Sequence, residues 1–571
     1  MIRLLLPLLL LLAIPFAGRG MAQQYGGTDQ RELRGVWLTT LLGLDWPQAS
    51  LRGNIEAQKK ALRTILDDVR RKNFNTVFFQ VRSRGNALYR STLEPWCSEL
   101  TGTLGKDPGW DPLAFAITEA RERGLELHAW FNVFRVWSAG APPQSSPPHL
   151  ALAYPSWVRR FGDDLWMDPG IPEAREYTLR VMEELVRNYD IDGIHLDYCR
   201  YADRGFDDEA TWRRYGENGM TKDDWRRNNV NALVEAAYKR LSAIRPSLIV
   251  GSAPIGIYQN LPTARGWEGR NAISQDSRAW LAGGYHDYVV PQMYWGLSRN
   301  GSRIDFEALV ADWSRNASGR HVHAGVAAYK EDIHPHLAEH VDAARAQGAS
   351  GVVFFRYEHI RDAGFSGRFD RKMLPPPLTW KDAIPPNPVR NLRRSPDEHG
   401  TRWSWDAPLA APDGESARWY AVMERRDGGR RVLRELLPAH TTHFVAGEAT
   451  AEIRILAVDR ARNLSRDDEE TLVATTKPVA HGRSPEARAA RAVFVADDLM
   501  LLGYELPRPA HVRLRLLDED SAELALLYDG YADAGVHVLG VELDKLDGEA
   551  AHTVFESGEL RVVLPVVSYQ P

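Results

Sequence analysis

The fold is decided by residues 192–201, which read Asp192-Gly193-Ile194-His195-Leu196-Asp197-Tyr198-Cys199-Arg200-Tyr201. An amphipathic helical pattern from Ala174 to Arg187 precedes this stretch, and Gly193 to Asp197 has the composition of a short buried strand. A helix that leads into a buried strand is the repeating unit of α/β proteins. The strand ends in a carboxylate, and α/β barrels gather their functional residues at the C-terminal ends of their strands. The stretch therefore predicts an α/β barrel with a functional site at Asp197.

The same alternation of strand and helix extends over residues 31–375. The predicted strands cover residues 34–39, 76–82, 125–132, 193–197, 248–253, 288–294, 321–327 and 351–357. Eight strand–helix steps fit a (β/α)8 barrel of the TIM type with enlarged loops. A doubly wound open sheet is the alternative, but it usually has fewer strands and often carries a glycine-rich phosphate-binding turn after the first one. The sequence shows no such turn there.

Two all-β sandwich domains are predicted after a proline-rich linker. Short alternating strands at residues 403–408 and 453–465 resemble those of a fibronectin type III domain, which we place at residues 385–477. A second region of period-two alternation, seen best in Val512 to Leu517, resembles a small Ig-like sandwich and is placed at residues 490–571. The expected architecture is therefore a barrel followed by two sandwiches.

The composition is that of an ordinary globular protein. The chain has 571 residues, too many for a single core, with 44% hydrophobic and 26% charged residues. A net charge of −5 gives no basis for a nucleic-acid partner. The 18 tryptophans and 20 tyrosines are more informative, because aromatic rings stack on sugar faces as well as filling cores. The two cysteines, Cys97 and Cys199, both follow predicted strands, so a disulfide and a pair of free thiols are both open.

Residues 1–22 have the pattern of a secretory signal peptide. Arg3 supplies a positive charge, Leu4 to Phe16 form an apolar run, and Gly20-Met21-Ala22 offers small residues for cleavage. No later stretch is long and apolar enough to cross a bilayer. We therefore expect an exported protein, located in the periplasm, at the cell surface or outside the cell, without a transmembrane segment after the signal is removed.

Acidic residues can be sorted by the end of the barrel at which they lie. Those that precede or begin their strands, and so belong to the opposite end from the chemistry, are Glu126, Asp190, Asp192 and Asp287. Asp197 ends its strand and lies at the functional end; the alternative for it is a salt bridge to Arg200. Asp45 and Asp168 are also at the functional end but have the context of turn residues.

Polar and aromatic side chains gather at the functional ends of four strands. Residues two apart in a strand share a face, so Gln80 points with Arg82 and Trp130 points with Asn132. Amide, guanidinium and aromatic groups around a carboxylate suit a ring-shaped ligand that is rich in hydroxyl groups. The alternative for each of them is a buried, satisfied polar layer inside the barrel. The predicted substrate-binding residues are Gln80, Arg82, Trp130, Asn132, His195, Arg200, Gln292, Tyr294 and Trp295.

His128 and His195 lie on neighbouring predicted strands and raise the question of a metal site. Both are two or more residues short of their strand ends, which favours hydrogen-bonded core histidines over metal ligands. The sequence contains no HExxH motif, no cluster of cysteine and histidine, and no G-x-S-x-G motif. We predict neither a metal nor another cofactor.

Five ordered motifs together resemble the glycosyl hydrolase-like 10 family over about residues 31–375. The motifs are Arg34-Gly35-Val36-Trp37, Phe74-Asn75-Thr76-Val77-Phe78-Phe79-Gln80-Val81-Arg82, Leu127-His128-Ala129-Trp130-Phe131-Asn132, Asp190-Ile191-Asp192-Gly193-Ile194-His195-Leu196-Asp197-Tyr198 and Pro291-Gln292-Met293-Tyr294-Trp295. The family includes a bacterial enzyme that cuts peptide-stripped glycan strands of peptidoglycan. The resemblance implies a barrel fold and glycosidase activity on an envelope or other polysaccharide, and Asp197 falls on the family's acid of strand four.

Glycoside hydrolysis usually needs two carboxyl groups, one as proton donor and one as nucleophile or base. Asp197 is the first, but no other predicted strand ends directly in an acid. Asp276, in the long loop after the fifth strand, is the leading candidate for the second, although it also suits the N-cap of the next helix. Glu358, just past the eighth strand, is the next candidate, and Glu268 shares the loop of Asp276.

The sequence as a whole predicts an exported glycoside hydrolase that acts on a polysaccharide, with peptidoglycan glycan strands as the expected substrate. The two sandwiches would position the enzyme, bind glycan or contact envelope proteins. The alternative is a non-catalytic glycan-binding envelope protein on a degenerate barrel, which the missing second acid motivates. A purely structural envelope protein would leave the polar strand ends unexplained.

Overall fold

A computed structural model divides the chain into two units, residues 1–474 and 475–571, and each is described by itself. The described residues are 31–138, 140–217, 219–365, 367–411, 413–425, 431–447 and 453–466 in the first unit, and 489–496, 499–506, 510–518, 523–532, 535–542, 552–557 and 560–565 in the second. The signal peptide predicted at residues 1–22 lies outside them. Within these ranges, no helix combines the length and the apolar character needed to cross a membrane.

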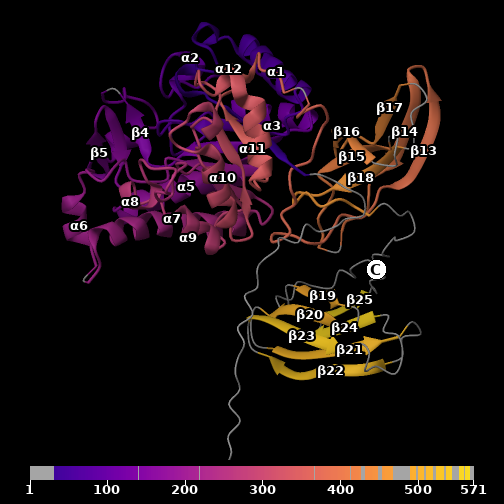
Figure 1. Ribbon diagram of the computed structural model, residues 1–571. Helices are drawn as coiled ribbons and strands as arrows, with labels where there is room; N and C mark the ends of the chain where they lie inside the picture. Colours follow the sequence, from indigo (N-terminus) through magenta and orange to yellow (C-terminus); the bar gives the residue numbers. More distant parts are fainter. Residues whose placement is uncertain are drawn as a thin grey trace, which may run out of the picture. The chain divides into compact units, whose positions relative to one another are not determined.

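The first unit contains the predicted barrel of parallel strands (Figure 1). Its strands are β1 (Leu33–Leu38), β2 (Thr76–Arg82), β3 (Glu126–Asn132), β7 (Gly193–Asp197), β8 (Ile249–Ser252), β9 (Tyr288–Val289), β10 (His321–Val322), β11 (Ala324–Ala327) and β12 (Gly351–Phe355). They are hydrogen-bonded in the order β10-β9-β8-β7-β3-β2-β1-β12-β11. Only His323 separates β10 from β11, so these two are halves of the seventh strand and the sheet closes into a ring of eight.

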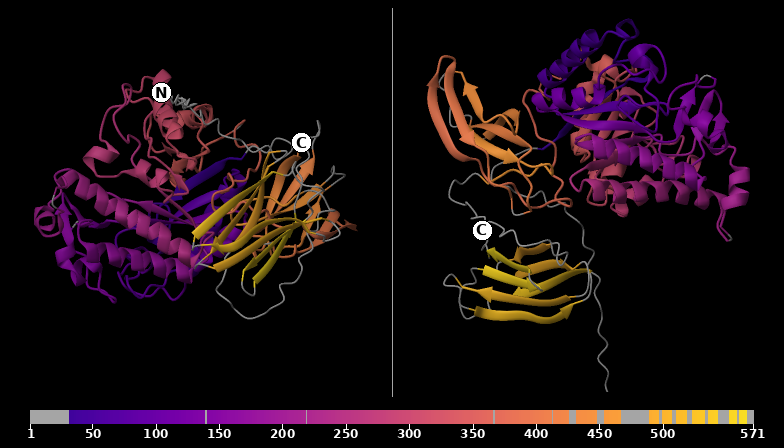
Figure 2. Two further views of the ribbon diagram at one scale, coloured as in Figure 1. Left: turned by 90° about the horizontal axis from the view of Figure 1, so that it is seen from below. Right: turned by 180° about the vertical axis from the view of Figure 1, so that it is seen from behind.

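Helices connect the strands and surround the barrel (Figures 1 and 2). They are α1 (Ile55–Arg71), α3 (Pro112–Glu122), α5 (Pro172–Asn188), α7 (Lys222–Ile244), α9 (Ser277–Ala282), α10 (Phe306–Arg315), α11 (Leu337–Ala346) and α12 (Tyr357–Ile360), with the shorter α2 (Ser98–Thr101), α4 (Leu150–Ala153), α6 (Glu209–Tyr215) and α8 (Gly269–Ala272) in the loops. Side-chain caps set their starts: Asn54 accepts from the N–H of Ala57 in α1, and Asp111 accepts from that of Ala114 in α3.

A chain of hydrogen bonds fills the middle of the barrel. The indole of Trp37 can only donate, so it donates to Nε2 of His195 at 3.1 Å, and the other ring nitrogen of His195 donates to the hydroxyl of Tyr288 at 3.1 Å. That hydroxyl donates to Nδ1 of His128 at 2.9 Å, and Nε2 of His128 donates to Glu126 at 3.3 Å. Burial lowers the pKa of His195 well below its usual value, so this ring is neutral. His128 and His195 are therefore hydrogen-bonded residues of the core.

A glycine on β8 makes room for the ring of Tyr288. A Cβ atom on Gly251 would lie 2.4 Å from the ring of Tyr288, closer than any side-chain contact permits. Tyr288 is 1% exposed and faces the barrel axis, where it joins two histidines. Gly251 is thus required by close packing inside the barrel.

The loop after β3 forms a small antiparallel sheet that the sequence analysis did not predict. Its strands are β4 (Arg135–Ser138), β5 (Val158–Phe161) and β6 (Asp164–Met167), in the order β4-β6-β5. The N–H of Val133, directly after β3, donates to the carbonyl of Asp197, which ties the start of this loop to the end of β7. The sheet therefore brings Arg135 and Trp166 beside Tyr198.

The two cysteines are buried at separate positions. Cys97 precedes α2 and Cys199 follows β7. Both are free thiols, which is one of the two states that the sequence left open.

Two antiparallel sheets follow the barrel in the first unit (Figure 1). One consists of β13 (Arg390–Asp397), β14 (Gly400–Asp406) and β17 (His443–Ala446), and the other of β16 (Arg431–Pro438), β15 (Trp419–Arg425) and β18 (Ile453–Val458). Trp405, Tyr420 and Ile455 pack between the two sheets, whereas Trp419 and Leu456 pack with Leu374 on the other side of the second sheet. That sheet is buried on both faces, which explains the apolar run from Ile455 to Val458 in β18. Its fibronectin type III character stays a prediction.

Arginines of this sandwich neutralise the acids at the N-terminal end of the barrel. Arg462 donates from Nε and Nη2 to both carboxylate oxygens of Glu126, at 2.8 and 2.6 Å, and all these atoms are buried. Arg418 pairs with Asp190 at 3.0 Å and with Asp192 at 2.6 Å. Three acids that the sequence assigned to this end of the barrel therefore anchor the sandwich.

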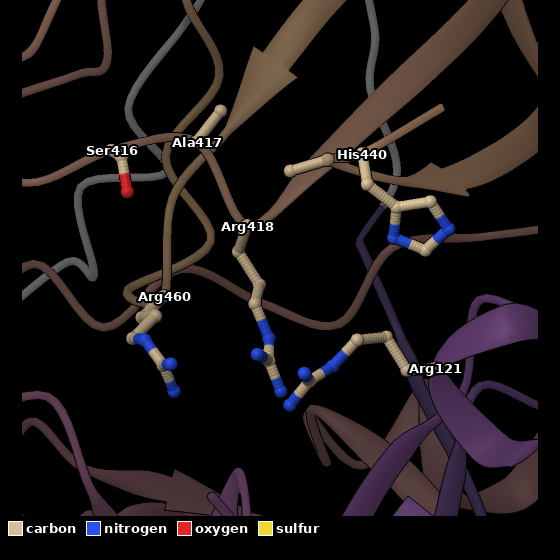
Figure 3. A pocket seen from close by; sticks show the side chains of 7 residues that line it. Arg121, Ser416, Ala417, Arg418, His440 and Arg460 are labelled. Atoms are coloured by element: carbon tan, nitrogen blue, oxygen red, sulfur yellow. The ribbon is translucent and has the colours of Figure 1, made fainter. Parts of the chain in front are cut away.

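A small pocket lies at the same contact (Figure 3). Its lining residues are Arg121, Ser416, Ala417, Arg418, Ala439, His440 and Arg460. Arg121 reaches from α3 toward Arg418 of the sandwich, and the guanidinium groups of Arg121, Arg418 and Arg460 all bind the carboxylate of Asp190. The pocket is at the opposite end of the barrel from Asp197. Its three arginines are all paired with Asp190, a residue of the contact between the barrel and the sandwich.

The second unit consists of two further antiparallel sheets. One contains β19 (Ala489–Ala496), β20 (Leu499–Leu506) and β23 (Gly535–Glu542), and the other β22 (Glu523–Ala532), β21 (Ala510–Leu517), β24 (His552–Ser557) and β25 (Leu560–Pro565). Val512, Leu514 and Leu516 of β21 are buried, in line with the period-two pattern of the sequence. The Ig-like character of this unit stays a prediction.

Replacing Arg462 with methionine should destabilise the first unit by about 3–5 kcal/mol at neutral pH, because Glu126 would remain buried without its cation. Burial alone would raise the pKa of Glu126, but Arg462 and His128 outweigh it and lower the pKa from 4.5 to about 2. A lowered folded-state pKa means that the stabilisation is complete above pH 4.5 and is lost as the pH falls toward 2. Urea unfolding at several pH values should therefore show a deficit that shrinks in acid.

Arg460→Met is the matched control, because Arg460 pairs with Asp190 at the surface, where both side chains are partly exposed. Its cost should stay near 0–1 kcal/mol, roughly the usual range for such pairs. A deficit for Arg462→Met that is as small as that of the control, or that does not depend on pH, would contradict the anchoring role.

Candidate active site

Asp197 is the last residue of β7, and side chains from two other strands hold its carboxylate. Oδ2 accepts from the indole nitrogen of Trp130 on β3 at 3.2 Å. Oδ1 accepts from the N–H of Tyr198 at 2.7 Å and from the side-chain amide of Gln292, just past β9, at 3.4 Å. Three predicted site residues, Asp197, Trp130 and Gln292, are therefore brought together.

The electrostatic surroundings of Asp197 favour the protonated acid. The residue is 9% exposed, and within the described ranges no arginine, lysine or histidine nitrogen lies within 4.0 Å of its carboxylate. The salt bridge to Arg200 that the sequence left open as an alternative is not formed. Burial is the largest effect and raises the pKa of Asp197 to about 6, although the Tyr198 N–H, Arg200 and Trp130 favour the charged form. Asp197 is thus a carboxyl group poised to exchange a proton near neutral pH.

Aromatic rings stand beside this acid. Tyr294 is half-buried close to Asp197, and burial first, then the negative charge of Asp197, raises the pKa of its phenol. Its ring centre lies 5.9 Å from that of Phe355 at the end of β12 and 6.3 Å from that of Tyr329 just after β11. Tyr329 is 44% exposed. Flat apolar faces next to a proton donor suit a sugar ring.

Arg200 lies three residues after Asp197, and its guanidinium faces Trp166 of the small sheet formed by β4, β5 and β6. Its guanidinium is 5.1 Å from the ring centres of Tyr198 and Trp166 and 4.9 Å from that of Trp267. Trp267, in the long loop after β8, is 43% exposed. Trp295, another predicted site residue, is half-buried against Gly256 of the same loop.

Four predicted substrate-binding residues lie in the protein interior. Gln80 accepts from the N–H groups of Thr40 and Leu41 and so shapes the loop after β1. Arg82 forms a fully buried pair with Glu94 and also donates to the carbonyl of Asn132. The side chain of Asn132 donates to the carbonyl of Ser83 at 2.8 Å. His195 belongs to the hydrogen-bonded chain along the barrel axis. All four side chains are therefore buried and hydrogen-bonded to protein atoms.

Asp276 and Glu268 are engaged with residues of their own loop. Asp276 is the N-cap residue of α9 but makes no capping hydrogen bond. It accepts instead from the hydroxyl of Tyr258 and lies 3.8 Å from Arg270. Tyr258 packs against Trp313 of the outer helix α10, with 6.1 Å between ring centres. Glu268 accepts from the N–H of Asn260 and the side chain of Asn271.

Glu358 lies in α12, immediately after the eighth barrel strand. Its side chain is 37% exposed, and its nearest cation is Arg361 at 3.6 Å. Its backbone N–H donates to Asp45, whose buried carboxylate is also bound by Arg356. Among the candidate acids discussed for the second role, Glu358 is thus the one with an exposed and weakly paired carboxylate at the strand ends.

The sequence analysis missed several aromatic residues of the site. Tyr329 follows β11 by two residues, so the strand-end argument would have found it if extended to the seventh strand. Trp166, Trp267 and Arg135 lie in loops whose folding no local pattern indicates. Arg135 donates to the hydroxyl of Tyr198 at 3.1 Å and pairs with Asp164 at 2.9 Å.

Comparisons with known proteins agree with this geometry. Residues 32–338, from β1 into α11 and including Asp197, match the family model described as Glycosyl hydrolase-like 10. Glycosyl hydrolase YngK of Bacillus subtilis (strain 168) is 31% identical over 485 residues, which cover 78% of this chain and 94% of that protein. Glycosyl hydrolase DigH of Escherichia coli (strain K12) is 34% identical over 330 residues, 53% of this chain and 74% of that protein.

Among solved structures, the glycoside hydrolase domain of PgaB (BpsB) from Bordetella bronchiseptica aligns with a TM-score of 0.41 and 15% identity, over 58% of this chain and 98% of that one. The family match covers more than half of the chain, and it contains all the barrel strands up to β11. The sequence match to YngK extends over most of both proteins. This chain therefore belongs to the glycosyl hydrolase-like 10 family.

Proposed function

We propose that this glycoside hydrolase is exported and cleaves the glycan strands of peptidoglycan, with Asp197 as the proton donor. One observation carries the catalytic part: Asp197 ends a central barrel strand, buried and hydrogen-bonded, with its pKa raised to about 6. A general acid needs this protonation behaviour near neutral pH. The peptidoglycan substrate is supported by the resemblance of the five sequence motifs, and export by the signal-like pattern of residues 1–22.

In the proposed reaction, Asp197 gives its proton to the glycosidic oxygen while the bond from that oxygen to the sugar carbon breaks. The same carbon forms its new bond to the second carboxylate, which water later displaces, or directly to a water molecule that this carboxylate deprotonates. The Asp197 carboxylate that results is stabilised by three N–H groups already in place, from Trp130, Gln292 and Tyr198. These donors need no rearrangement as the negative charge of the carboxylate appears. They therefore lower the activation free energy of the proton transfer. The rings of Tyr294 and Tyr329 provide faces for the sugar.

We assign the second carboxyl role to Glu358. It is exposed at the C-terminal end of the barrel, whereas Asp276 is 16% exposed and engaged by Tyr258 and Arg270. Glu358 also adjoins His359, whose ring lies 6.1 Å from that of Tyr329. His359 and Tyr329 thus lie between Glu358 and Tyr294, the ring beside Asp197.

Asp197→Asn should reduce kcat on peptide-stripped glycan strands by about 10²–10⁴-fold, the usual contribution of a general acid. Glycan binding should persist, since asparagine keeps the size of the side chain and one oxygen that accepts hydrogen bonds. Release of new reducing ends and pull-down on glycan strands measure the two quantities. Asp203→Asn, in the following loop, is the matched control and should retain activity. Wild-type turnover by Asp197→Asn would refute the assignment, and binding without turnover by the wild-type protein would indicate a glycan-binding protein.

Glu358→Gln and Asp276→Asn distinguish the two candidates for the second acid. We expect Glu358→Gln to lose at least about 100-fold in kcat and Asp276→Asn to stay near the wild-type rate. Azide should restore turnover to a small apolar variant at position 358 if that carboxylate acts as the nucleophile. The reverse pattern of losses would transfer the role to Asp276.

The rate should depend on the protonation of Asp197. Because its pKa is raised to about 6, kcat/KM should fall as the pH rises through about 6. Trp130→Phe removes a hydrogen bond that favours the carboxylate, so the pKa should rise further and this fall should move to higher pH. Trp212→Phe, on α6 and without a contact to Asp197, should leave the profile unchanged. A shift of the Trp130→Phe profile to lower pH would be incompatible with this electrostatic account.

A further inference from the structure

Arg200 is a half-buried cation beside the proton donor. It lies on the loop that follows β7, close enough to Asp197 to favour the charged form of that carboxyl group, yet it forms no salt bridge with it. Three rings surround its guanidinium, those of Trp166, Tyr198 and Trp267, at 4.9–5.1 Å from ring centre to carbon. Packing of this kind fixes the plane and the direction of the guanidinium group.

Four other arginines at this end of the barrel have carboxylate partners. Their pairs are Arg82 with Glu94, Arg84 with Glu99, Arg135 with Asp164 and Arg356 with Asp45. Arg200 differs, because no carboxylate oxygen of the described residues lies within 4.0 Å of its nitrogens. Its hydrogen bonds run from Nη1 alone, to the carbonyls of Tyr201 and Ala202 at 3.1 and 3.4 Å.

An unpaired guanidinium in this position costs free energy. Burial is the largest influence on Arg200 and lowers its pKa, which means that its surroundings oppose the positive charge. Within the described part of the chain, Nε and Nη2 of Arg200 make no hydrogen bond to protein atoms. Two adjacent donors of this kind match the two oxygens of a carboxylate.

We propose that Arg200 binds a carboxylate group of the substrate and so selects glycans that carry an acidic sugar next to the cleaved bond. The inference rests on the proposed glycosidase function and narrows its substrate class. In peptide-stripped peptidoglycan, the lactyl ether on every second sugar provides such a carboxylate. Trp267, exposed beside the guanidinium, offers a ring on which the same sugar stacks.

The arrangement also couples binding to acid catalysis. Arg200 lowers the pKa of Asp197, whereas burial raises it. A substrate carboxylate on Arg200 would cancel this opposing charge, so Asp197 would hold its proton to higher pH in the complex than in the free protein. For an acidic glycan, kcat should then decrease at a higher pH than kcat/KM does. For a neutral glycan, the two should decrease at the same pH.

Two forms of one substrate test the proposal. Peptide-stripped glycan strands are compared with the same strands after chemical reduction of the lactyl carboxyl groups to alcohols. The wild-type protein should prefer the acidic strands by about 10- to 100-fold in kcat/KM, the usual effect of a hydrogen-bonded charge pair. Arg200→Met should lose this preference, so that the ratio of kcat/KM on the acidic strands to kcat/KM on the reduced strands falls to about 1. Arg200→Lys should keep part of the preference, because lysine retains the charge but not the paired donors.

Arg204→Met is the matched control, since Arg204 is exposed on the same loop and its Nε donates to the carbonyl of Asn271. It should keep the wild-type preference. Equal cleavage of both strands by the wild-type protein would refute the inference and leave the glycosidase function intact. Equal loss on both strands in Arg200→Met would show a structural role for Arg200 instead. Cleavage of neither strand by the wild-type protein would overturn the proposed function and this inference together.

Discussion

The closed barrel controls the electrostatics of the molecule, because its interior excludes water from every polar group along its axis. The protein satisfies most of these groups in pairs: Trp37 with His195, Tyr288 with both His195 and His128, and His128 with Glu126. The burial that makes such pairing necessary reaches the end of β7. There Asp197 keeps neutral hydrogen-bond donors but forms no salt bridge, and burial, which the nearby charge of Arg200 only partly offsets, raises its pKa to about 6.

The two ends of the barrel use carboxylates in opposite ways. At the N-terminal end, Glu126, Asp190 and Asp192 are ionised anchors for arginines of the first sandwich. Burial would raise the pKa of Glu126 as it does that of Asp197, but Arg462 reverses the effect. Carboxyl groups therefore serve stability at one end and, in the proposed mechanism, proton transfer at the other, and Glu126 differs from Asp197 by the buried guanidinium that is paired with it.

Short-range patterns predicted the strands, most helices and the position of Asp197, because strand and helix periods are local properties. They did not predict which polar strand-end residues are accessible. Gln80 and Arg82 share a strand, but β2 shifts register against β3 between them, and Arg82 turns to a buried partner, Glu94. Pairings such as that of Arg462 with Glu126, 336 residues apart, depend on the tertiary fold. For that reason the sequence separated Asp197 from the anchoring acids but placed Asp276 ahead of Glu358 as the second acid, whereas the geometry leads us to propose Glu358.

The site holds an acid and a cation only three residues apart that form no salt bridge with each other, and Tyr198 contacts both of them. Tyr198 has a φ of 51°, a left-handed conformation that is costly for a residue with a large side chain. In that conformation its N–H donates to Asp197, its hydroxyl accepts from Arg135, and its ring packs on the guanidinium of Arg200. A direct salt bridge would lower the pKa of Asp197 and occupy the donors of Arg200. The strained tyrosine thus contacts the acid and the arginine at once, and the proposed proton transfer and substrate binding rest on these two groups staying without a salt bridge.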